Sequence, residues 1–493
     1  MTSQMQAGNA PSRPPNVVTI VLDCARAKNF SMSGGDRLAE TPIIDSLASR
    51  GTVFPRAVAP ANWTLPSHFS IFTGTYPNVH GMRTFQERAA PLVTTAASMR
   101  KAGYDTGMFT ENVYLVGGVG LEDGFDVQRS PKAGISEEEK TFVNGLIGRA
   151  RFLYSARARK LFSRLPPLIA PLSFLFHSQE VAFKEDVCDE RTVARFGEWL
   201  SGKSPARPFY AFLNFVDTHD PYDLVLGGEK LGFLDRAYLY APRYYLLAVP
   251  GLQSLLHWSA LVGGYVKSIE AADRKVGQLL SVLEAHGESD RTMLVITSDH
   301  GQSFGEGGNA FHGCGATDSV TRVPLVVVPP AGVKVPRRVE RWVSLCEIDS
   351  WIKSAAAGLA PYDEEGRTSA VGATADQYSG VVYAEGGPVS DPIRSLRGIR
   401  EDQSWNHRLL AAYRGDEKFL LDLETSEVFR WEAEGDPDLS APARLSAEAA
   451  ATVRREVFGP YEAQEAARIA LTSGAPTPAE LEIDQRLRLW GYD

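Results

Sequence analysis

Five short apolar runs, separated by stretches with helical character, constrain the fold of this chain more than any other feature. They lie at residues 17–22, 106–109, 209–216, 293–296 and 325–328. Continuous apolar runs of this length are typical of strands that are buried on both faces, as in a mostly parallel sheet covered by helices. The sequence therefore predicts an α/β fold built around one large sheet.

A helical stretch between the first two runs supports this prediction. Thr41 is a suitable cap, Pro42 suits a first helical turn, and Gly51 is a suitable stop. Apolar residues between them, at Ile44 and Leu47, share one face of such a helix. We therefore expect a helix over residues 42–50 that packs on the sheet.

Polar residues closely follow four of the apolar runs. They are Asp23, Thr110 with Asn112, Asp217 with His219, and Asp299 with His300. Ligands in open α/β sheets bind outside the carboxyl ends of the strands, so these side chains form a candidate site. An aspartate after a strand can also be a turn or helix cap, and that interpretation holds for each position taken alone. The coincidence at four strand ends favours a shared site.

Size and charge exclude several classes of protein. The chain has 493 residues, enough for a large core with an appended part. Lysine and arginine total 51 against 60 aspartates and glutamates, which gives a net charge of −9. This balance argues against a chain that mainly coats nucleic acid, and we expect no nucleic-acid partner.

The cysteines and the apolar stretches indicate the compartment. The four cysteines are widely spaced and form no CxxC pair, which favours a reducing environment. The first 15 residues lack the apolar segment of an export signal, and no apolar stretch is long enough to cross a membrane. We therefore expect a cytoplasmic protein without a membrane span.

Composition divides the chain into a core and a smaller C-terminal part. We expect an α/β core at residues 15–335, a part with a small antiparallel sheet at 336–440, and a helical tail at 441–493. The core contains two stretches that look inserted. Residues 141–181 are basic and amphipathic, which fits a solvated helix pair or peripheral contact with a membrane. Residues 224–262 are rich in tyrosine and leucine, which fits a lid over the site or buried helix packing.

A loop that leads into a short helix carries a candidate nucleophile. Residues 62–68 read Asn-Trp-Thr-Leu-Pro-Ser-His, which places Thr64 at a helix N-terminus. Backbone N–H groups and the helix dipole favour negative charge there. A structural N-cap threonine predicts the same local sequence. The polar residues that follow the strands favour a catalytic role for Thr64. An ion held by Asp23, Asp299 and His300 beside Thr64 would lower the pKa of the Thr64 hydroxyl.

Two further histidines, His219 and His312, lie in loops near the predicted edge of the sheet. Either can protonate a leaving group or bind a charged oxygen. A histidine in a Gly-containing loop, such as residues 311–313, can equally be a packing or solvent-facing residue.

Taken together, these segments resemble the sulfatase-like branch of the alkaline phosphatase superfamily. The resemblance covers about residues 15–435 and rests on segments 18–26, 41–45, 63–74, 76–77, 80–81, 219–222, 298–301 and 322–324 and on Asp273, in the family's order. It implies an alkaline phosphatase-like α/β fold, with a large, mostly parallel or mixed sheet sandwiched by helices and a small C-terminal antiparallel sheet. It also implies a metal-dependent hydrolase of ester bonds.

Four positions depart from the usual sulfatase pattern. Such sulfatases carry a cysteine or serine that is oxidised to formylglycine, and here that position is Thr64, which cannot become an aldehyde by that route. The signature arginine is replaced by His68, and the second of two adjacent metal-binding aspartates is Cys24. His312 stands in place of a lysine that follows the Asp-His-Gly motif. The pattern is similar to that of superfamily phosphotransferases and phosphodiesterases with a threonine nucleophile.

The resemblance implies a one-metal site and a covalent mechanism. Thr64 would attack phosphorus in line and form a phospho-threonine, which water or an alcohol then releases. The implied ligands of a divalent ion are Asp23, Thr64, Asp299 and His300, and the implied catalytic partners of Thr64 are His219 and His312. Further candidates for substrate binding are His68, Asn78, Thr110 and Asn112. Zinc suits a site with histidine, and manganese or calcium suits its oxygen ligands.

We therefore predict a metal-dependent hydrolase of phosphate or phosphonate esters that acts on a small-molecule or lipid-like substrate. Three alternatives stay open. The first is a hydrolase of sulfate or sulfamate esters that uses Thr64 without formylglycine. The second is a phosphotransferase that acts on an alcohol acceptor. The third is a catalytically degenerate binding protein, which the changes at Cys24 and His68 suggest.

Overall fold

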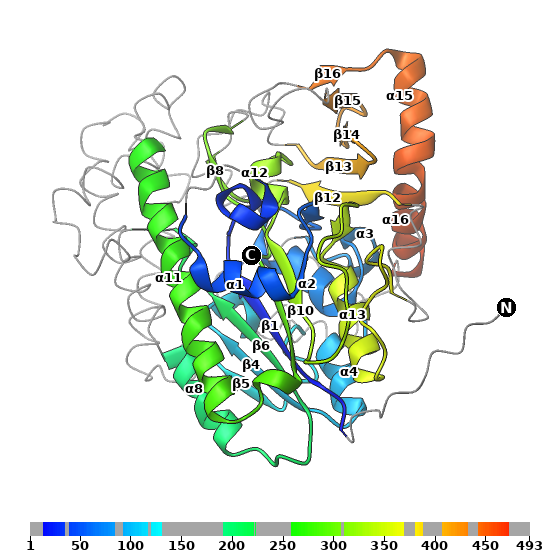
Figure 1. The fold of residues 1–493 in the computed structure, drawn as a ribbon. Coiled ribbons are helices and arrows are strands. Elements are labelled where there is room, and N and C mark those ends of the chain that lie inside the picture. The colour runs from blue at the N-terminus through cyan, green and yellow to red at the C-terminus, as the bar shows by residue number, and fades with distance from the viewer. Residues whose placement is uncertain are drawn as a thin grey trace, which may run out of the picture.

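The computed structural model describes most of the predicted core and the C-terminal sheet (Figure 1). The described residues are 13–34, 39–83, 92–116, 120–130, 191–220, 222, 258–306, 310–368, 380–387, 407–431 and 442–472. The predicted insertion at 141–181 lies outside them. So does the predicted insertion at 224–262, except for residues 258–262, which begin a long helix.

The predicted large sheet is present, and each of the five apolar runs forms one of its strands. In spatial order, this seven-stranded sheet of the described residues consists of β2 (Thr52–Val53), β10 (Leu325–Val328), β7 (Thr292–Thr297), β1 (Asn16–Leu22), β6 (Phe209–Phe215), β4 (Asp105–Thr110) and β5 (Val127–Arg129). Strands β7, β1, β6, β4 and β5 are parallel neighbours. β10 runs antiparallel to β7 and β2, so the sheet is mixed.

Strand β1 explains why apolar residues follow one another without alternation. Val17 and Val21 face one apolar cluster, whereas Val18, Ile20 and Leu22 face another. All five side chains are fully buried. The strand is therefore covered on both faces, which is the arrangement that a continuous apolar run predicts.

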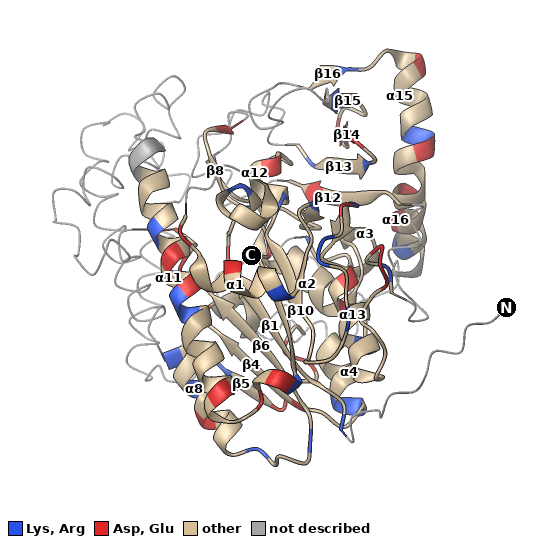
Figure 2. Ribbon diagram, viewed as in Figure 1, with Lys and Arg blue, Asp and Glu red and all other residues tan. Residues whose placement is uncertain are grey.

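Helices supply the two covering layers, as Figure 1 shows. One cluster packs residues of α1 (Pro42–Arg50), α8 (Arg191–Ser201) and α11 (Trp258–Ala285) against the sheet. The other packs residues of α2 (Thr64–Thr73), α4 (Thr95–Lys101) and α13 (Glu347–Ala356) against the opposite face. In Figure 2 the positions of charged residues are spread along α8 and α11, whereas the central strands carry almost none.

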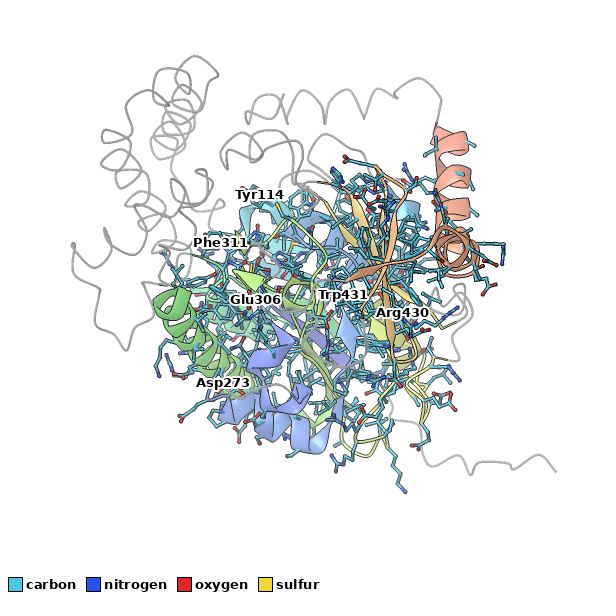
Figure 3. All side chains as sticks on the ribbon, turned by 90° about the horizontal axis from the view of Figure 1, so that it is seen from above. Tyr114, Asp273, Glu306, Phe311, Arg430 and Trp431 are labelled. Carbon is cyan, nitrogen blue, oxygen red and sulfur yellow. The ribbon has the colours of Figure 1, made fainter. Side chains whose placement is uncertain are left out.

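The C-terminal part forms the predicted antiparallel sheet. Its five strands are, in spatial order, β12 (Val382–Gly386), β13 (Leu409–Arg414), β14 (Glu417–Asp422), β15 (Val428–Trp431) and β16 (Ala443–Arg444). Two helices, α15 (Ala447–Val453) and α16 (Gly459–Thr472), follow it. Val457, Phe458 and Tyr461 pack on the sheet from this helical region. Seen from above in Figure 3, Arg430 and Trp431 of β15 lie to one side of Tyr114 and Phe311.

Smaller elements complete the described chain. They are the pairs β3 (Ala57–Val58) with β11 (Val343–Ser344) and β8 (Ser303–Phe304) with β9 (Ala310–Phe311), the helices α3 (Pro77–His80) and α12 (Asp318–Thr321), and short helical segments at Ala27–Asn29, Ser31–Ser33, Val113–Val116, Ser289–Arg291 and Arg454–Phe458. Among the described helices, none combines the length and the apolar character that crossing a membrane requires.

Candidate active site

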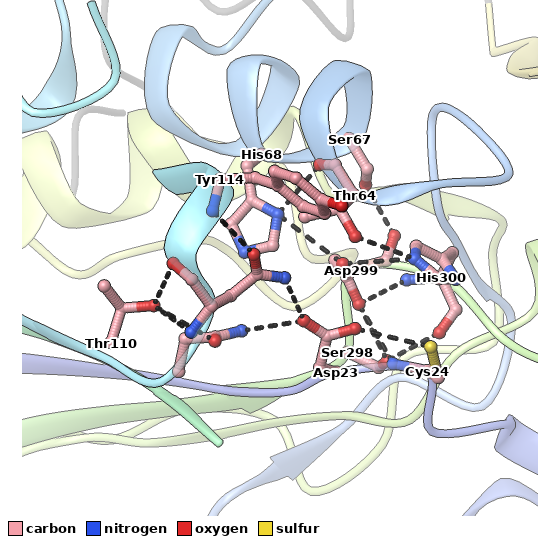
Figure 4. A network of polar contacts seen from close by, with 12 residues as sticks. Asp23, Cys24, Thr64, Ser67, His68, Thr110, Tyr114, Ser298, Asp299 and His300 are labelled. Atoms are coloured by element: carbon pink, nitrogen blue, oxygen red, sulfur yellow. Dashed lines mark hydrogen bonds and ion pairs between the residues drawn. The ribbon is translucent and has the colours of Figure 1, made fainter. Parts of the chain in front are cut away.

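The polar residues at the strand ends meet in one buried cluster (Figure 4). Asp23 follows β1, whereas Asp299 and His300 follow β7. One donor atom from each of these three residues lies within 4.8 Å of the others. Thr64 Oγ1 lies 3.4 Å from His300 Nε2. The structure thus brings together the four residues expected to hold a metal ion.

Thr64 is the first residue of α2, and it does not serve as the helix cap. The N-cap is Trp63, whose extended backbone (φ −159°, ψ 170°) directs the chain into the helix, and its side chain makes no capping hydrogen bond. The Thr64 hydroxyl faces His300 instead, and the side chain is almost fully buried. The local structure therefore places a hydroxyl, rather than a cap, at the positive end of the helix dipole.

One oxygen of Asp299 lacks a hydrogen-bond partner although it is buried. Oδ1 accepts hydrogen bonds from the backbone N–H groups of Cys24 (3.2 Å) and His300 (2.9 Å). Oδ2 has no hydrogen bond and lies 3.3 Å from His300 Nε2. A buried carboxylate oxygen without a partner is costly. A cation between these atoms would satisfy it.

His300 presents the nitrogen that a metal needs. Its Nδ1 lies 2.9 Å from the carbonyl oxygen of Gly301, which accepts a hydrogen bond from the Nδ1–H group. Nε2 therefore carries the lone pair, and it points toward Thr64 and Asp299. Metal-ligating histidines are commonly oriented in this way by a carbonyl on the other nitrogen.

Asp23 is held by a layer of amide and hydroxyl groups. Its Oδ2 accepts hydrogen bonds from Asn112 Nδ2 (2.8 Å) and from Asn214 Nδ2 (3.4 Å). The Thr218 hydroxyl donates a hydrogen bond to the Asp23 carbonyl. Thr110 Oγ1 lies 3.2 Å from Asn214 Oδ1 and accepts from the Asn112 backbone N–H. Of the two residues expected from sequence to line a substrate pocket, Asn112 donates to Asp23, and Thr110 contacts Asn112 and Asn214.

Burial and mutual repulsion shape the charges of the cluster. Burial and the nearby Asp23 raise the pKa of Asp299 to about 7. Burial by itself would raise the pKa of Asp23. The neighbouring histidines and the Asn112 hydrogen bond outweigh this effect and lower the pKa of Asp23 to about 2. Burial lowers the pKa of His300 to about 4, so its ring is neutral and can act as a ligand. A divalent cation would allow both carboxylates to ionise.

Three histidine rings lie in a row beside this cluster. The His312 ring centroid is 4.7 Å from that of His300 and 4.9 Å from that of His219. His219 Nδ1 lies 2.7 Å from the Asp220 carbonyl, and His312 Nδ1 lies 2.7 Å from Gln302 Oε1. Burial and the other two histidines lower the pKa of His312 well below its usual range. His219 and His312 are half-buried, at the more open side of the cluster.

Two residues predicted to bind substrate, His68 and Asn78, are fully buried and contact the protein interior instead. His68 is fully buried beneath Asp299, with its ring against Phe72 and Phe212. Its Nδ1 lies 2.9 Å from the Thr64 carbonyl and 3.5 Å from Asp299 Oδ2, so it supports these residues from below. Asn78 is also fully buried, on α3, and its Nδ2 donates to the carbonyl of Tyr461 on α16. This contact ties Asn78 to the C-terminal helix.

Three groups that contact or support the cluster, Asn214, Cys24 and Lys275, are not among the site residues predicted from sequence. Asn214 could have been noticed as the one amide inside the apolar run of β6. In sequence Cys24 stands where the family has an aspartate, and in the structure its Sγ lies 3.3 Å from Asp23 Oδ1. No local sequence pattern indicates the role of Lys275 on α11, because the residues that it contacts are distant in sequence.

Lys275 connects the two loops that carry hydrogen-bond donors to Asp23. Its Nζ lies 2.9 Å from Glu111 Oε1 and 2.8 Å from Asp217 Oδ2, and all three side chains are buried. Glu111 precedes Asn112, and Asp217 precedes Thr218, so each acid adjoins a residue that donates to Asp23. The ion triad therefore stabilises the floor of the site.

Replacing Lys275 with methionine should lower the free energy of unfolding by about 3–5 kcal/mol, because two buried carboxylates would lose their cation. Denaturant titration measures this change. Lys267→Met on the same helix is the matched control, since Lys267 is half-exposed and pairs with Glu270 at the surface. It should change stability by less than about 1 kcal/mol. Equal effects of the two substitutions would contradict a structural role for the triad.

Comparisons with known proteins place the chain in a family. A family model described as "Sulfatase" matches residues 15–349. The chain is similar to an arylsulfatase of Clostridium perfringens (strain 13 / Type A), with 23% identity over 344 residues, 65% of this chain and 69% of that protein. It is also similar to steryl-sulfatase of Rattus norvegicus, with 23% identity over 364 residues, 67% of this chain and 63% of that protein. The chain thus spans about two thirds of the length of these relatives.

A solved structure gives the same fold. The phosphonate monoester hydrolase of Agrobacterium radiobacter superposes with a TM-score of 0.59 at 18% sequence identity, and the alignment covers 94% of this chain and 99% of that one. At this level of identity, the similarity concerns the fold.

Proposed function

The chain belongs to the sulfatase family, and on that premise we propose that it is a metal-dependent hydrolase of phosphate or phosphonate esters with Thr64 as its nucleophile. The coarser statement, that it is an ester hydrolase of this family, follows from the family match and the fold. The single observation that carries the finer proposal is the Thr64 hydroxyl at the start of α2, 3.4 Å from His300 Nε2.

The residues around Thr64 fit a divalent cation. Asp23, Asp299 and His300 offer two carboxylates and one neutral imidazole, and Asp299 Oδ2 is buried without a hydrogen bond. Zinc, manganese and calcium are the candidate ions for this mixed donor set. When bound, the ion supplies positive charge that favours the alkoxide form of Thr64 and offsets charge on the phosphoryl oxygens.

The chain's own residues carry out the remaining steps. Thr64 loses its hydroxyl proton to solvent and its Oγ1 forms the bond to phosphorus, while the ester oxygen leaves with the electron pair of the broken P–O bond and takes a proton from solvent. His219 and His312 stabilise the charge that develops on that oxygen. Water then attacks the phospho-threonine and restores the hydroxyl. Asn112, Asn214 and Thr218 keep Asp23 in place throughout.

The preference for phosphorus over sulfur rests on Thr64. Usual sulfatases need an aldehyde made from cysteine or serine, and a threonine hydroxyl instead suits attack on phosphorus. The phosphonate monoester hydrolase with the same fold is compatible with this substrate class. A second candidate, hydrolysis of sulfate esters without formylglycine, is favoured by the names of the arylsulfatase and steryl-sulfatase relatives.

A substrate panel tests this proposal. We expect the purified protein, loaded with zinc, manganese or calcium, to hydrolyse aryl phosphodiesters or phosphonate monoesters at least about tenfold faster than the matching aryl sulfate. A preference for the sulfate would support the second candidate. Release of the aryl alcohol that accelerates with added alcohols, and yields their phosphate esters, would indicate a phosphotransferase. No turnover with any metal would favour a binding protein.

Removal of the ion should destabilise the fold. Without it, the carboxylates of Asp23 and Asp299 lie buried side by side. An ion present at a thousandfold excess over its Kd stabilises the native state by about 4 kcal/mol. We therefore expect chelation to lower the thermal midpoint and re-addition of the ion to restore it. A midpoint that does not respond to metal would contradict a buried cation site.

A further inference from the structure

The main chain of Asn62 joins three segments beside the site. Asn62 is buried and lies two residues before Thr64. Its backbone N–H donates to the Glu385 carbonyl on β12 (3.1 Å), and its backbone carbonyl accepts from the Gly313 N–H (2.9 Å). Gly313 directly follows His312. Asn62 therefore links the loop that leads to the nucleophile with β12 and with the loop that carries His312.

The side-chain amide of Asn62 holds the same loop at a second point. Its Nδ2 donates to the Gly315 carbonyl (2.9 Å) and lies 3.4 Å from the Gly387 carbonyl, just past the end of β12. With the bond at Gly313, this contact holds the loop on both sides of Cys314. Two hydrogen bonds from one residue fix the direction of the loop as well as its distance.

The loop that carries His312 has an unusual backbone. Phe311, Gly313 and Gly315 have φ values of 60°, 79° and 68°. A residue with a Cβ, such as Phe311, keeps a left-handed conformation only where the surrounding structure imposes it. The hydrogen bonds from Asn62 to the two glycines are contacts of this kind, because they act on the residues that follow Phe311 and His312.

The loop also packs closely against β12 at Gly386. A Cβ at Gly386 would lie 2.2 Å from the Gly315 carbonyl oxygen and 3.0 Å from the Ala316 Cβ. Glycine alone leaves room for this approach. β12 thus limits the loop on one side, while Asn62 holds it by hydrogen bonds.

We propose that Asn62 is a positioning residue that sets the place of His312 relative to Thr64. The connection between the two is short, because the Asn62 carbonyl binds the residue after His312 and only Trp63 separates Asn62 from Thr64. A displacement at phosphorus needs the nucleophile and the group that stabilises the leaving oxygen in register, and a misplacement of about 1 Å can cost about a hundredfold in rate. This kinetic consequence rests on the proposed function, whereas the placement of His312 does not.

The dependence of kcat/KM on the leaving group tests this inference. We compare the para-nitrophenyl and phenyl esters of one phosphate or phosphonate, because phenol is the poorer leaving group and needs more stabilisation from His312. In Asn62→Ala, kcat/KM for the phenyl ester should fall at least about fivefold more than kcat/KM for the para-nitrophenyl ester. A merely structural loss reduces the amount of active protein and lowers both values by the same factor.

Two further variants support the comparison. Asn16→Ala is the matched control, since Asn16 is equally buried and its Nδ2 donates to Glu288 (2.7 Å) at the end of β1 opposite Asp23. It should lower stability and leave the ratio of the two kcat/KM values unchanged. Asn62→Asp keeps the side-chain shape but turns an oxygen toward the Gly315 carbonyl, so it should shift the ratio in the same direction even if the alanine variant does not fold.

A crystal structure of the Asn62 variant gives a readout besides activity. We expect His312 to shift by about 1 Å or more relative to Thr64, while α2 keeps its position. An adduct on Thr64 should still form with the para-nitrophenyl ester. An unchanged ratio of kcat/KM values in a folded variant, or a His312 ring that stays in place, would overturn the inference. Absence of an adduct in the parent would count against the proposed nucleophile instead, and the position of His312 in the variant would then decide the inference alone.

Discussion

Replacing Thr64 with alanine is expected to lower kcat for the best phosphate or phosphonate ester by at least about three orders of magnitude, a loss of about 4 kcal/mol of transition-state stabilisation. The covalent route needs an oxygen at this position, and the alanine side chain has none. The fold should persist, because the hydroxyl does not cap α2 and lies 3.4 Å from His300 Nε2, too far for a strong hydrogen bond. Steady-state kinetics with circular dichroism as a check on folding measures both effects.

Two other variants control for this loss. Thr64→Ser keeps the oxygen and should retain measurable turnover. Thr73→Ala, at the far end of the same helix, removes a hydroxyl that only donates to the Phe69 carbonyl or contacts Thr75. It should leave kcat within a factor of about two. If Thr64→Ala retained activity within about tenfold of the parent, the nucleophile assignment would be wrong.

Replacing Asp299 with asparagine should remove the metal and the activity together. The substitution keeps the shape of the side chain but removes one of the two carboxylates around the ion. We expect the turnover at limiting metal to fall by about a hundredfold or more, and the bound metal to fall below one equivalent in elemental analysis.

The stability of the same variant separates a metal ligand from a merely structural residue. Asp299 Oδ2 is buried without a hydrogen bond, so it already destabilises the parent protein once a chelator has removed the metal. The chelated variant should therefore be at least as stable as the chelated parent, whereas added metal should stabilise only the parent. The surface change Asp290→Asn should leave the metal response intact. Full metal content and full activity in Asp299→Asn would exclude Asp299 as a ligand.

The sequence predicted the fold well because the strands of a sheet covered on both faces have a local signature. The run at residues 17–22 is apolar at nearly every position, and the structure buries both faces of β1. The ends of such strands lie at one edge of the sheet, which is why Asp23, Asp299 and His300 could be predicted to meet. Thr64 could be placed at the start of a helix from the sequence of residues 62–68.

The support of the site could not be predicted, because it depends on contacts between distant segments. Lys275 is 164 residues from Glu111 and 58 from Asp217, and only the packing of α11 brings them together. His68 and Asn78 could not be placed from sequence, because the packing of α2 and α3 buries His68 in the core and directs Asn78 toward α16. Side-chain direction at these positions follows from tertiary packing.

Trapping the covalent intermediate tests the central claim most directly. The metal-loaded protein is mixed with an aryl phosphate or phosphonate ester that it hydrolyses, quenched in acid during turnover, and analysed by intact mass and then by peptide mapping. The account predicts a mass increase of one phosphoryl or phosphonyl group, located on Thr64 and absent from Thr64→Ala. Rapid turnover without an adduct at any quench time, or an adduct on another residue, would contradict it.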